Sequence, residues 1–91
     1  MIQSFAHRGL AELFQHGGSR RVRADLISRV LRALDALDGA RRPVDMALPG
    51  YRLHKLQGRP LRYSVHVNGP WCITFEWEEG HPCRVDLEQY H

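Results

Sequence analysis

The fold is constrained most by residues 63–77, which read YSVHVNGPWCITFEW. Apolar side chains, mainly β-branched or aromatic, recur at every second position on both sides of Asn68-Gly69-Pro70. A period of two is typical of strands that have one buried and one exposed face. Asn and Gly adopt positive φ at little cost, and proline lacks the amide that a strand ladder needs. The stretch therefore predicts a β-hairpin.

A third strand is predicted at residues 83–87, where Val85 and Leu87 continue the alternation. The three strands would share one apolar face. The opposite face would carry His66, Cys72, Thr74, Glu76, Arg84 and Asp86. The alternation places Cys72 and Cys83 on opposite faces, so we expect no disulfide and a reducing compartment.

Two helices are predicted before the hairpin. Leu10, Leu13 and Phe14 have helical spacing in HRGLAELFQH, which ends at Gly17-Gly18. A longer apolar stripe begins near Arg23 and ends at Asp38-Gly39; its members are Leu26, Ile27, Val30, Leu31, Leu34 and Leu37.

Residues 2–5 are predicted to add an edge strand, residues 40–50 form a linker with one short turn, and residues 51–56 alternate as a strand. The predicted fold class is α+β, with two N-terminal helices packed on one face of a mostly antiparallel four- to five-stranded sheet. At 91 residues, we expect residues 1–91 to form a single domain.

Positive charge is concentrated in the first two-thirds of the chain. Residues 1–62 contain twelve Arg or Lys and five acids, for a net charge of +7, whereas residues 63–91 carry −4. Eleven of the twelve cations are Arg, which binds phosphate bidentately and stacks on bases. No apolar run approaches the roughly 20 residues of a membrane span, and no signal peptide is recognisable. These features favour a cytoplasmic protein with a nucleic-acid partner and no membrane contact.

Several segments together resemble a known family: MIQSFAHRGLAELF, PGYRLHKLQG, YSVHVNGPWCITFEW with the Gly turn that follows it, and VDLEQYH. Their order and spacing are similar to those of the HigB-type killer toxins of the RelE superfamily. The resemblance implies a RelE-like fold and the toxin of a type II toxin–antitoxin pair, an endoribonuclease that cuts mRNA on the ribosome. It also implies a HigA-type helix-turn-helix antitoxin as partner, with operator DNA contacted only through the antitoxin complex.

The resemblance assigns catalytic roles to His54, Tyr90 and His91. The family often has Lys, Arg and an acidic residue where this chain has Gln57, Cys72 and Gln89. These departures remove two positive charges and one carboxylate from the inferred site.

RNA can be cut without a metal or other cofactor if a base takes the 2′-OH proton, an acid protonates the leaving 5′ oxygen and cations hold the phosphate. We hypothesise that His54 is the base and that His91, aided by Tyr90, is the acid or a hydrogen-bond donor to the phosphate. The reverse assignment of base and acid stays open. The candidate RNA or phosphate ligands are Lys55, Arg59, Arg62 and Arg84. The candidate ribosome contacts are Arg20, Arg21 and Arg23, which lie at or before the start of the second helix.

Other interpretations stay open at this point. His54, His66 and His91 are a possible metal-ligand set, although no spacing resembles a zinc site. Trp71 and Trp77 either stack on bases or join the core, and the alternation favours the core. Three functions stay open. The chain is a ribosome-dependent RNase toxin, a catalytically weak relative that binds antitoxin or ribosome, or an interaction module that shares only the fold.

Overall fold

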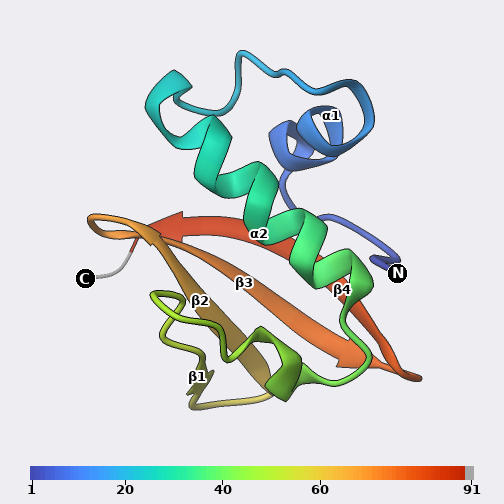
Figure 1. Cartoon of the computed structure of the whole chain (residues 1–91). Helices are drawn as coiled ribbons and strands as arrows, with labels where there is room; N and C mark the ends of the chain where they lie inside the picture. The colour runs from blue at the N-terminus through green and yellow to red at the C-terminus, as the bar shows by residue number, and fades with distance from the viewer. Residues whose placement is uncertain (90–91) are drawn as a thin grey trace.

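The structure is a computed structural model that describes residues 1–89. Within these residues, four antiparallel strands form one sheet in the order β1-β2-β3-β4, with the helices packed on one face (Figure 1). In chain order the elements are α1 (Arg8–His16), the 3₁₀ turn η1 (Ala24–Leu26), α2 (Ile27–Gly39), the 3₁₀ turn η2 (Pro43–Met46), β1 (His54–Leu56), β2 (Arg62–Asn68), β3 (Trp71–Glu78) and β4 (His81–Gln89). The α+β prediction is confirmed, with four strands in the sheet.

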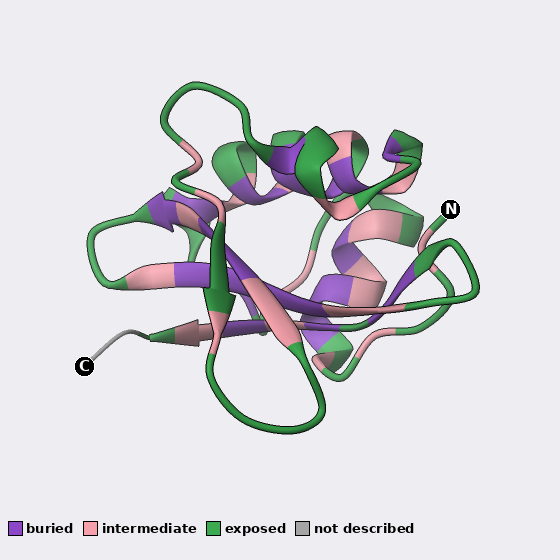
Figure 2. Ribbon diagram, turned by 90° about the horizontal axis from the view of Figure 1, so that it is seen from below, coloured by how far each residue is buried: buried purple, intermediate pink, exposed green. Residues whose placement is uncertain are grey.

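The core lies between α2 and the sheet, as the apolar stripe predicts. Val30, Leu34 and Leu37 of α2 are fully buried, together with Ile73 and Phe75 of β3. Each such side chain stabilises the fold by about 1.5–3 kcal/mol through the apolar surface it removes from water. Figure 2 shows the buried segments of the helices and strands facing one another across this layer. Packing the helices on this face leaves the other face of the sheet free for polar residues.

The first helix begins and ends with local caps. The ring Nδ1 of His7 accepts a hydrogen bond from the Leu10 amide at 3.2 Å, which satisfies one of the free amides of the first turn. Gly17 ends the helix with a φ of 81°, a left-handed conformation that glycine adopts without a Cβ penalty. The helix predicted in this segment is therefore confirmed.

Residues 2–5 lie alongside β4 but do not form a strand of the sheet. The Gln3 amide donates to the Pro82 carbonyl at 2.9 Å, and the Val85 amide donates to the Ser4 carbonyl at 3.1 Å. The only pairing between Phe5 and Val85 is a single parallel bridge. The predicted edge position is right, but within residues 1–89 this segment adds no fifth strand.

The strand predicted at residues 51–56 is shorter than expected. Arg52 has a φ of 50°, which lies in the left-handed region and interrupts an extended run. Pairing with β2 therefore begins only at His54. The prediction was wrong for the first three residues because alternation alone cannot show a local left-handed residue.

A β-bulge corrects the predicted positions of the cysteines. The pairing of β3 with β4 shifts between Thr74 and Glu76, where Arg84 has a φ of 48°. Cys83 consequently pairs with Glu76, so it lies on the same face as Cys72 rather than on the opposite one. Both thiols are nevertheless free and buried, in agreement with the absence of a disulfide predicted for this pair.

No helix among the described residues has the length and apolar character needed to cross a membrane.

Candidate active site

The sheet register brings five residues together on the face opposite the helices. His54 of β1 pairs with Ser64 of β2, which in turn pairs with Thr74 of β3. His66 of β2 pairs with Cys72 of β3, one step closer to the hairpin tip. Side chains on directly paired and diagonal positions of one face lie within reach of each other. The antiparallel sheet thus gathers residues that are up to 20 positions apart in sequence.

All of these residues except Thr74 line a cavity of about 460 Å³, here called the sheet cavity. Its lining consists of Arg52, His54, Ser64, His66, Gly69, Pro70 and Cys72. Ser64 and Cys72 are buried, with 3% and 4% of their surfaces exposed, whereas His54 and Arg52 are exposed. The lining contains two imidazoles and one guanidinium but no carboxylate. Such a cavity suits an anionic group such as a phosphodiester.

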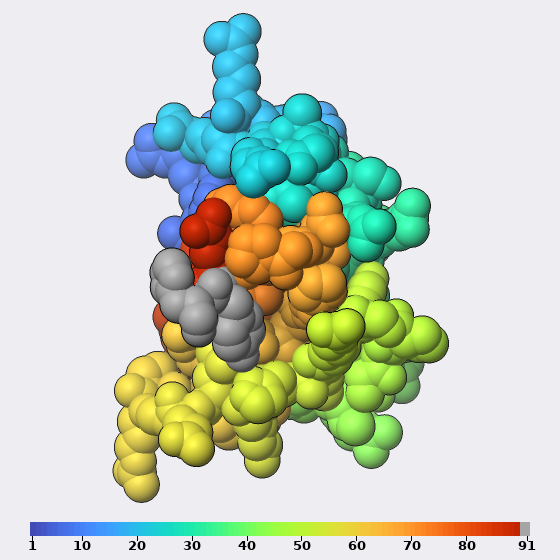
Figure 3. Space-filling model, turned by 90° about the vertical axis from the view of Figure 1, so that its left-hand side faces the viewer, coloured from blue at the N-terminus to red at the C-terminus, as the bar shows by residue number. Residues whose placement is uncertain are grey.

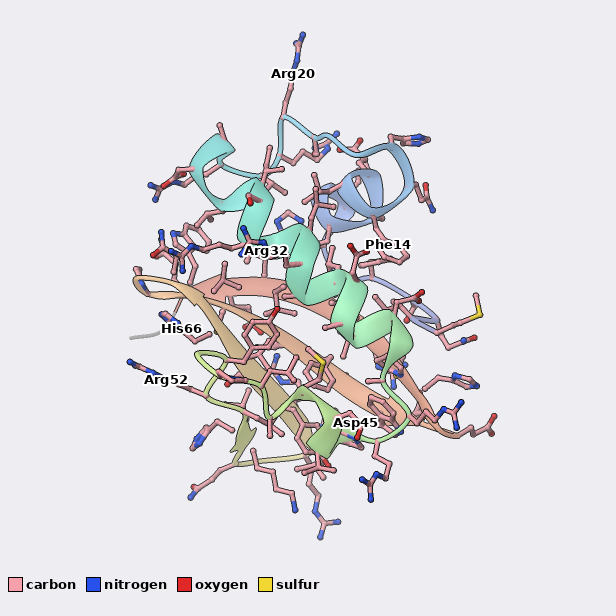
Figure 4. All side chains as sticks on the ribbon, viewed as in Figure 1. Phe14, Arg20, Arg32, Asp45, Arg52 and His66 are labelled. Atoms are coloured by element: carbon pink, nitrogen blue, oxygen red, sulfur yellow. The ribbon has the colours of Figure 1, made fainter. Side chains whose placement is uncertain are left out.

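His66 is held in place by both its backbone and its ring. The His66 amide donates to the Tyr51 carbonyl at 2.6 Å, and ring nitrogen Nε2 lies 3.2 Å from the Gly69 carbonyl oxygen. His66 also lines a second cavity of about 360 Å³ between α2 and β2, here called the helix cavity. In Figure 4, His66 lies between Arg52 of the sheet cavity and Arg32 of the helix cavity.

The helix cavity is also basic. Arg29 and Arg32 of α2 line it, and one Arg29 nitrogen contacts the Val67 carbonyl oxygen at 3.5 Å. The one acid in its lining, Asp25, is paired with Arg23 at 2.8 Å. Figure 3 shows that the start of α2, the tip of the β2–β3 hairpin and the segment around residue 52 face the same side of the molecule. The two cavities together therefore form a positively charged surface.

Arg62 forms an ion pair across the sheet. Its guanidinium lies 2.7 Å from the Glu88 carboxylate and donates to the Thr74 hydroxyl at 3.3 Å, and that hydroxyl also donates to Glu88. Partial burial acts to raise the pKa of Glu88, but hydrogen bonds from Thr74 and Arg62 outweigh it and hold the pKa below its ordinary value. Arg62 therefore belongs to a satisfied network beside the sheet cavity.

Arg84 is bound by two carboxylates at the other end of β3. Its guanidinium lies 2.8 Å from Glu76 and also pairs with Glu78. Hydrogen bonds to these two acids raise the pKa of Arg84, and the bond from Arg84 lowers the pKa of Glu78. The structure places Arg84 outside both cavity linings.

The remaining predicted ligands lie at separate places. Lys55 pairs with Tyr63 and lines a hollow with Arg42, so it faces away from the side chain of its neighbour His54. Arg59 is exposed in the loop between β1 and β2. Tyr90 and His91 lie outside the described residues, so their predicted roles stay predictions.

The three arginines predicted to contact the ribosome lie between α1 and η1. Arg20 projects from the surface (Figure 4), and Arg21 pairs with Glu12 at 3.4 Å. Arg23 pairs with Asp25 and also lies 5.9 Å from the centre of the Trp71 ring, a cation–π distance. Both Trp71 and Trp77 are half-buried and pack against the core, as the alternation favours.

The possible metal-ligand set includes His91, which lies outside the described residues. Among residues 1–89, no group of three or more His, Cys, Asp or Glu side chains is arranged to hold a metal ion.

Comparison with known proteins identifies the family. The family model described as "RelE-like toxin of type II toxin-antitoxin system HigB" matches residues 3–90. Endoribonuclease HigB of Proteus vulgaris is 36% identical over 92 residues, an alignment that covers 100% of both chains. The chain belongs to the HigB-like toxin family. The resemblance predicted from the sequence is confirmed, and membership of a type II toxin–antitoxin family implies an antitoxin partner.

Cys72 places a buried, uncharged side chain in the lining of the sheet cavity. Burial raises the pKa of the Cys72 thiol above its ordinary value, and the nearby Glu88 carboxylate raises it further. The thiol therefore stays protonated near neutral pH and is not an activated nucleophile.

Sequence reasoning did not select as RNA ligands four residues that the structure places in the two cavities. Arg52 and His66 line the sheet cavity, and Arg29 and Arg32 line the helix cavity. The alternation already assigned His66 to the polar face, and Arg29 and Arg32 fall outside the apolar stripe of the second helix. The sequence does not show that α2 and the segment before β1 pack against β2, and this packing is what brings the four residues to the cavities.

Proposed function

We propose that this chain is a ribosome-dependent endoribonuclease that cuts mRNA and so inhibits translation and growth. The observation that carries the proposal is the full-length similarity to a protein named Endoribonuclease HigB. The basic sheet and helix cavities support it, because a phosphodiester backbone is the anion such surfaces bind. The antitoxin is proposed to be a HigA-type helix-turn-helix protein, through which operator DNA is reached.

The proposed reaction needs no metal or other cofactor. A base removes the 2′-OH proton, the 2′ oxygen attacks the phosphorus, and the bond to the 5′ oxygen breaks as an acid supplies a proton to it. His54 is the proposed base, since it is exposed at the sheet cavity and an imidazole can accept a proton near neutral pH. His91, aided by Tyr90, is the proposed acid or the hydrogen-bond donor to the phosphate.

The negative charge on the phosphate requires nearby cations. Arg52 is the described guanidinium that lines the same cavity as His54, so we add it to the candidate ligands. Arg59 and Lys55 stay candidates for contacts with the flanking RNA. Arg62 and Arg84 would have to exchange a carboxylate for the phosphate, because both are already paired. Arg20, Arg21 and Arg23 are the proposed ribosome contacts.

A second candidate function is favoured by Cys72. The family often has Arg at this position, and here the side chain is buried and uncharged. Loss of that charge from the phosphate site fits a relative that binds antitoxin or ribosome without cutting efficiently.

Brief induction in a bacterial host, followed by primer extension on abundant mRNAs, separates the two candidates. Cleavage ends that depend on induction support the nuclease; growth inhibition or ribosome association without such ends supports the weak relative. The chain with His54→Ala and a chain lacking Tyr90 and His91 should not cut. His81→Ala is the matched control, because His81 is an exposed histidine at the start of β4, far from the sheet cavity. Unchanged cleavage by the His54 variant would remove that residue from the mechanism.

The antitoxin is tested separately. The product of the adjacent reading frame should co-purify with this chain, relieve growth arrest and contain a helix-turn-helix domain. An adjacent product that neither binds nor relieves arrest would contradict the proposed partner.

A further inference from the structure

His66 occupies the position that faces the neutral residue in the sheet cavity. It pairs directly with Cys72 across β2 and β3, and it lies diagonally from His54, which pairs with Ser64. Diagonal neighbours on one face of an antiparallel pair are about 7–8 Å apart at Cα, within reach of two imidazole rings that share a phosphate. The proposed reaction as described above gives His66 no part.

The hydrogen bond at the hairpin tip fixes which nitrogen of His66 is left for a ligand. The Gly69 carbonyl oxygen is only an acceptor, so ring nitrogen Nε2, 3.2 Å away, must carry a proton. Within residues 1–89 the other nitrogen, Nδ1, has no hydrogen-bond partner. In the neutral ring Nδ1 presents a lone pair, whereas in the protonated ring it presents an N–H. Only the protonated ring would attract a phosphate there.

The charged groups around His66 favour an anion at this point. The titratable and charged residues that line the two cavities beside it are Arg52 and His54 from the β1 side, Cys72 from β3, and Tyr51, Asp25, Arg29 and Arg32 around the helix cavity. Cys72 is a neutral thiol, and Asp25 is paired with Arg23. The described residues around His66 thus carry more positive than negative charge, which favours binding of a phosphate. None of their carboxylates is free to pair with the imidazolium instead.

We propose that protonated His66 donates a hydrogen bond from Nδ1 to the phosphate at the cut and supplies the positive charge that Cys72 does not. The role rests on the proposed nuclease function and requires no proton transfer by His66. It makes His66 an electrostatic catalytic residue of the sheet cavity, with the Gly69 carbonyl orienting its ring. The chain would then replace a permanently charged guanidinium on β3 by a titratable group on β2.

Two substitutions at position 66 separate this role from a structural one. His66→Gln keeps an amide N–H that can reach the Gly69 carbonyl but cannot become a cation. His66→Arg keeps a cation that does not titrate near neutrality. The assay is single-turnover cleavage of mRNA on programmed ribosomes between about pH 6 and about pH 8, the range in which an imidazole changes charge. Melting temperatures check folding, and His81→Gln is the matched control.

We expect His66→Gln to slow cleavage by about 10–100-fold at unchanged melting temperature, as loss of a hydrogen bond between two charged groups does. His66→Arg should restore most of the rate. The ratio of its rate to that of the unaltered chain should rise with pH, by up to about tenfold per unit, because only the imidazole loses its charge. Taking this ratio cancels the titration of His54 and of any other shared group.

The outcomes distinguish this inference from the function on which it rests. Cleavage by the unaltered chain, together with an unreduced rate for His66→Gln, overturns the role of His66 alone. A rate lost equally in the Gln and Arg variants, or a ratio that does not change with pH, also overturns it, since a merely structural residue would behave in this way. If the unaltered chain does not cut at all, the proposed function fails and this inference fails with it.

Discussion

Two sets of arginines in the same molecule differ in whether their charge is already used. Arg62 and Arg84 reach toward acids of β3 and β4, where Glu88, Glu76 and Glu78 bind them. Arg29, Arg32 and Arg52 have no carboxylate within salt-bridge distance among residues 1–89, and they line the two cavities. The pairing of charges, more than their number, therefore locates the surface for a phosphate.

The difference has a simple energetic basis. An exposed ion pair contributes only about 0.2–1 kcal/mol to stability, so a phosphate could displace the carboxylate from the arginine. The phosphate must then compensate for the ion pair that is lost. An unpaired guanidinium loses only hydration and some side-chain entropy when it binds. Substrate contacts should consequently be strongest on the β1 and α2 side of the molecule and weakest near the β3–β4 turn.

The largest difference is expected between Arg52→Gln and Arg84→Gln, which remove the same charge from the two sides. Arg52→Gln should lower single-turnover cleavage by about 10–100-fold, because a charge-assisted hydrogen bond contributes roughly 1.5–3 kcal/mol. Arg84→Gln should change the rate by less than about threefold, since Glu76 and Glu78 already hold that side chain. Equal losses in both variants would show that Arg84 binds the substrate, as the sequence predicted. They would contradict the proposed difference between paired and unpaired arginines.

A smaller effect is expected in the salt dependence of ribosome binding. With His54→Ala present to prevent cleavage, the double variant Arg29→Gln and Arg32→Gln should bind roughly tenfold more weakly. The slope of log affinity against log salt should fall by about 1 for each phosphate that the variant no longer binds. The control is Arg41→Gln with Arg42→Gln, which removes the same net charge from outside both cavities. Equal slopes for the two double variants would mean that the helix cavity does not bind RNA.

Much of the fold could be predicted from local patterns, and each exception has an identifiable physical cause. The hairpin, both helices and the four-stranded sheet follow from periodicity. The left-handed residues Arg52 and Arg84 shorten β1 and shift β4, and no alternation rule indicates them, because they are not glycines. The N-terminal segment joins β4 through only one bridge, which depends on tertiary contacts.

The site could be predicted only in part. His54 was selected through the family resemblance, and the structure places it at a cavity. Arg62 and Arg84 were selected for their charge, but the partners that neutralise them come from other strands and could not be read from sequence. Conversely, the cationic surface of the helix cavity depends on the packing of α2 beside β2.

Breaking the Arg62 pair should affect stability more than cleavage. Arg62→Met removes the partner of Glu88 and one donor to the Thr74 hydroxyl, which is buried. Because both charged side chains are more than a third exposed, the loss should be only about 1 kcal/mol in the free energy of unfolding. Urea denaturation measures this value, and the cycle with Glu88→Gln isolates the pair. A large loss of cleavage with unchanged stability would instead assign Arg62 to the substrate.

The smallest effect should appear as the solution is made acidic, and it should be confined to the paired side. Glu88 and Glu78 both have pKa values held below the ordinary value of about 4.5, so their ionised forms stabilise the folded state. That stabilisation is complete above about pH 4.5 and is lost as the pH falls through the lowered values. Glu88→Gln should therefore lower the melting temperature at neutral pH and converge with the unaltered chain in acid. Arg52→Gln should show no such convergence, because within residues 1–89 its side chain has no carboxylate partner to protonate.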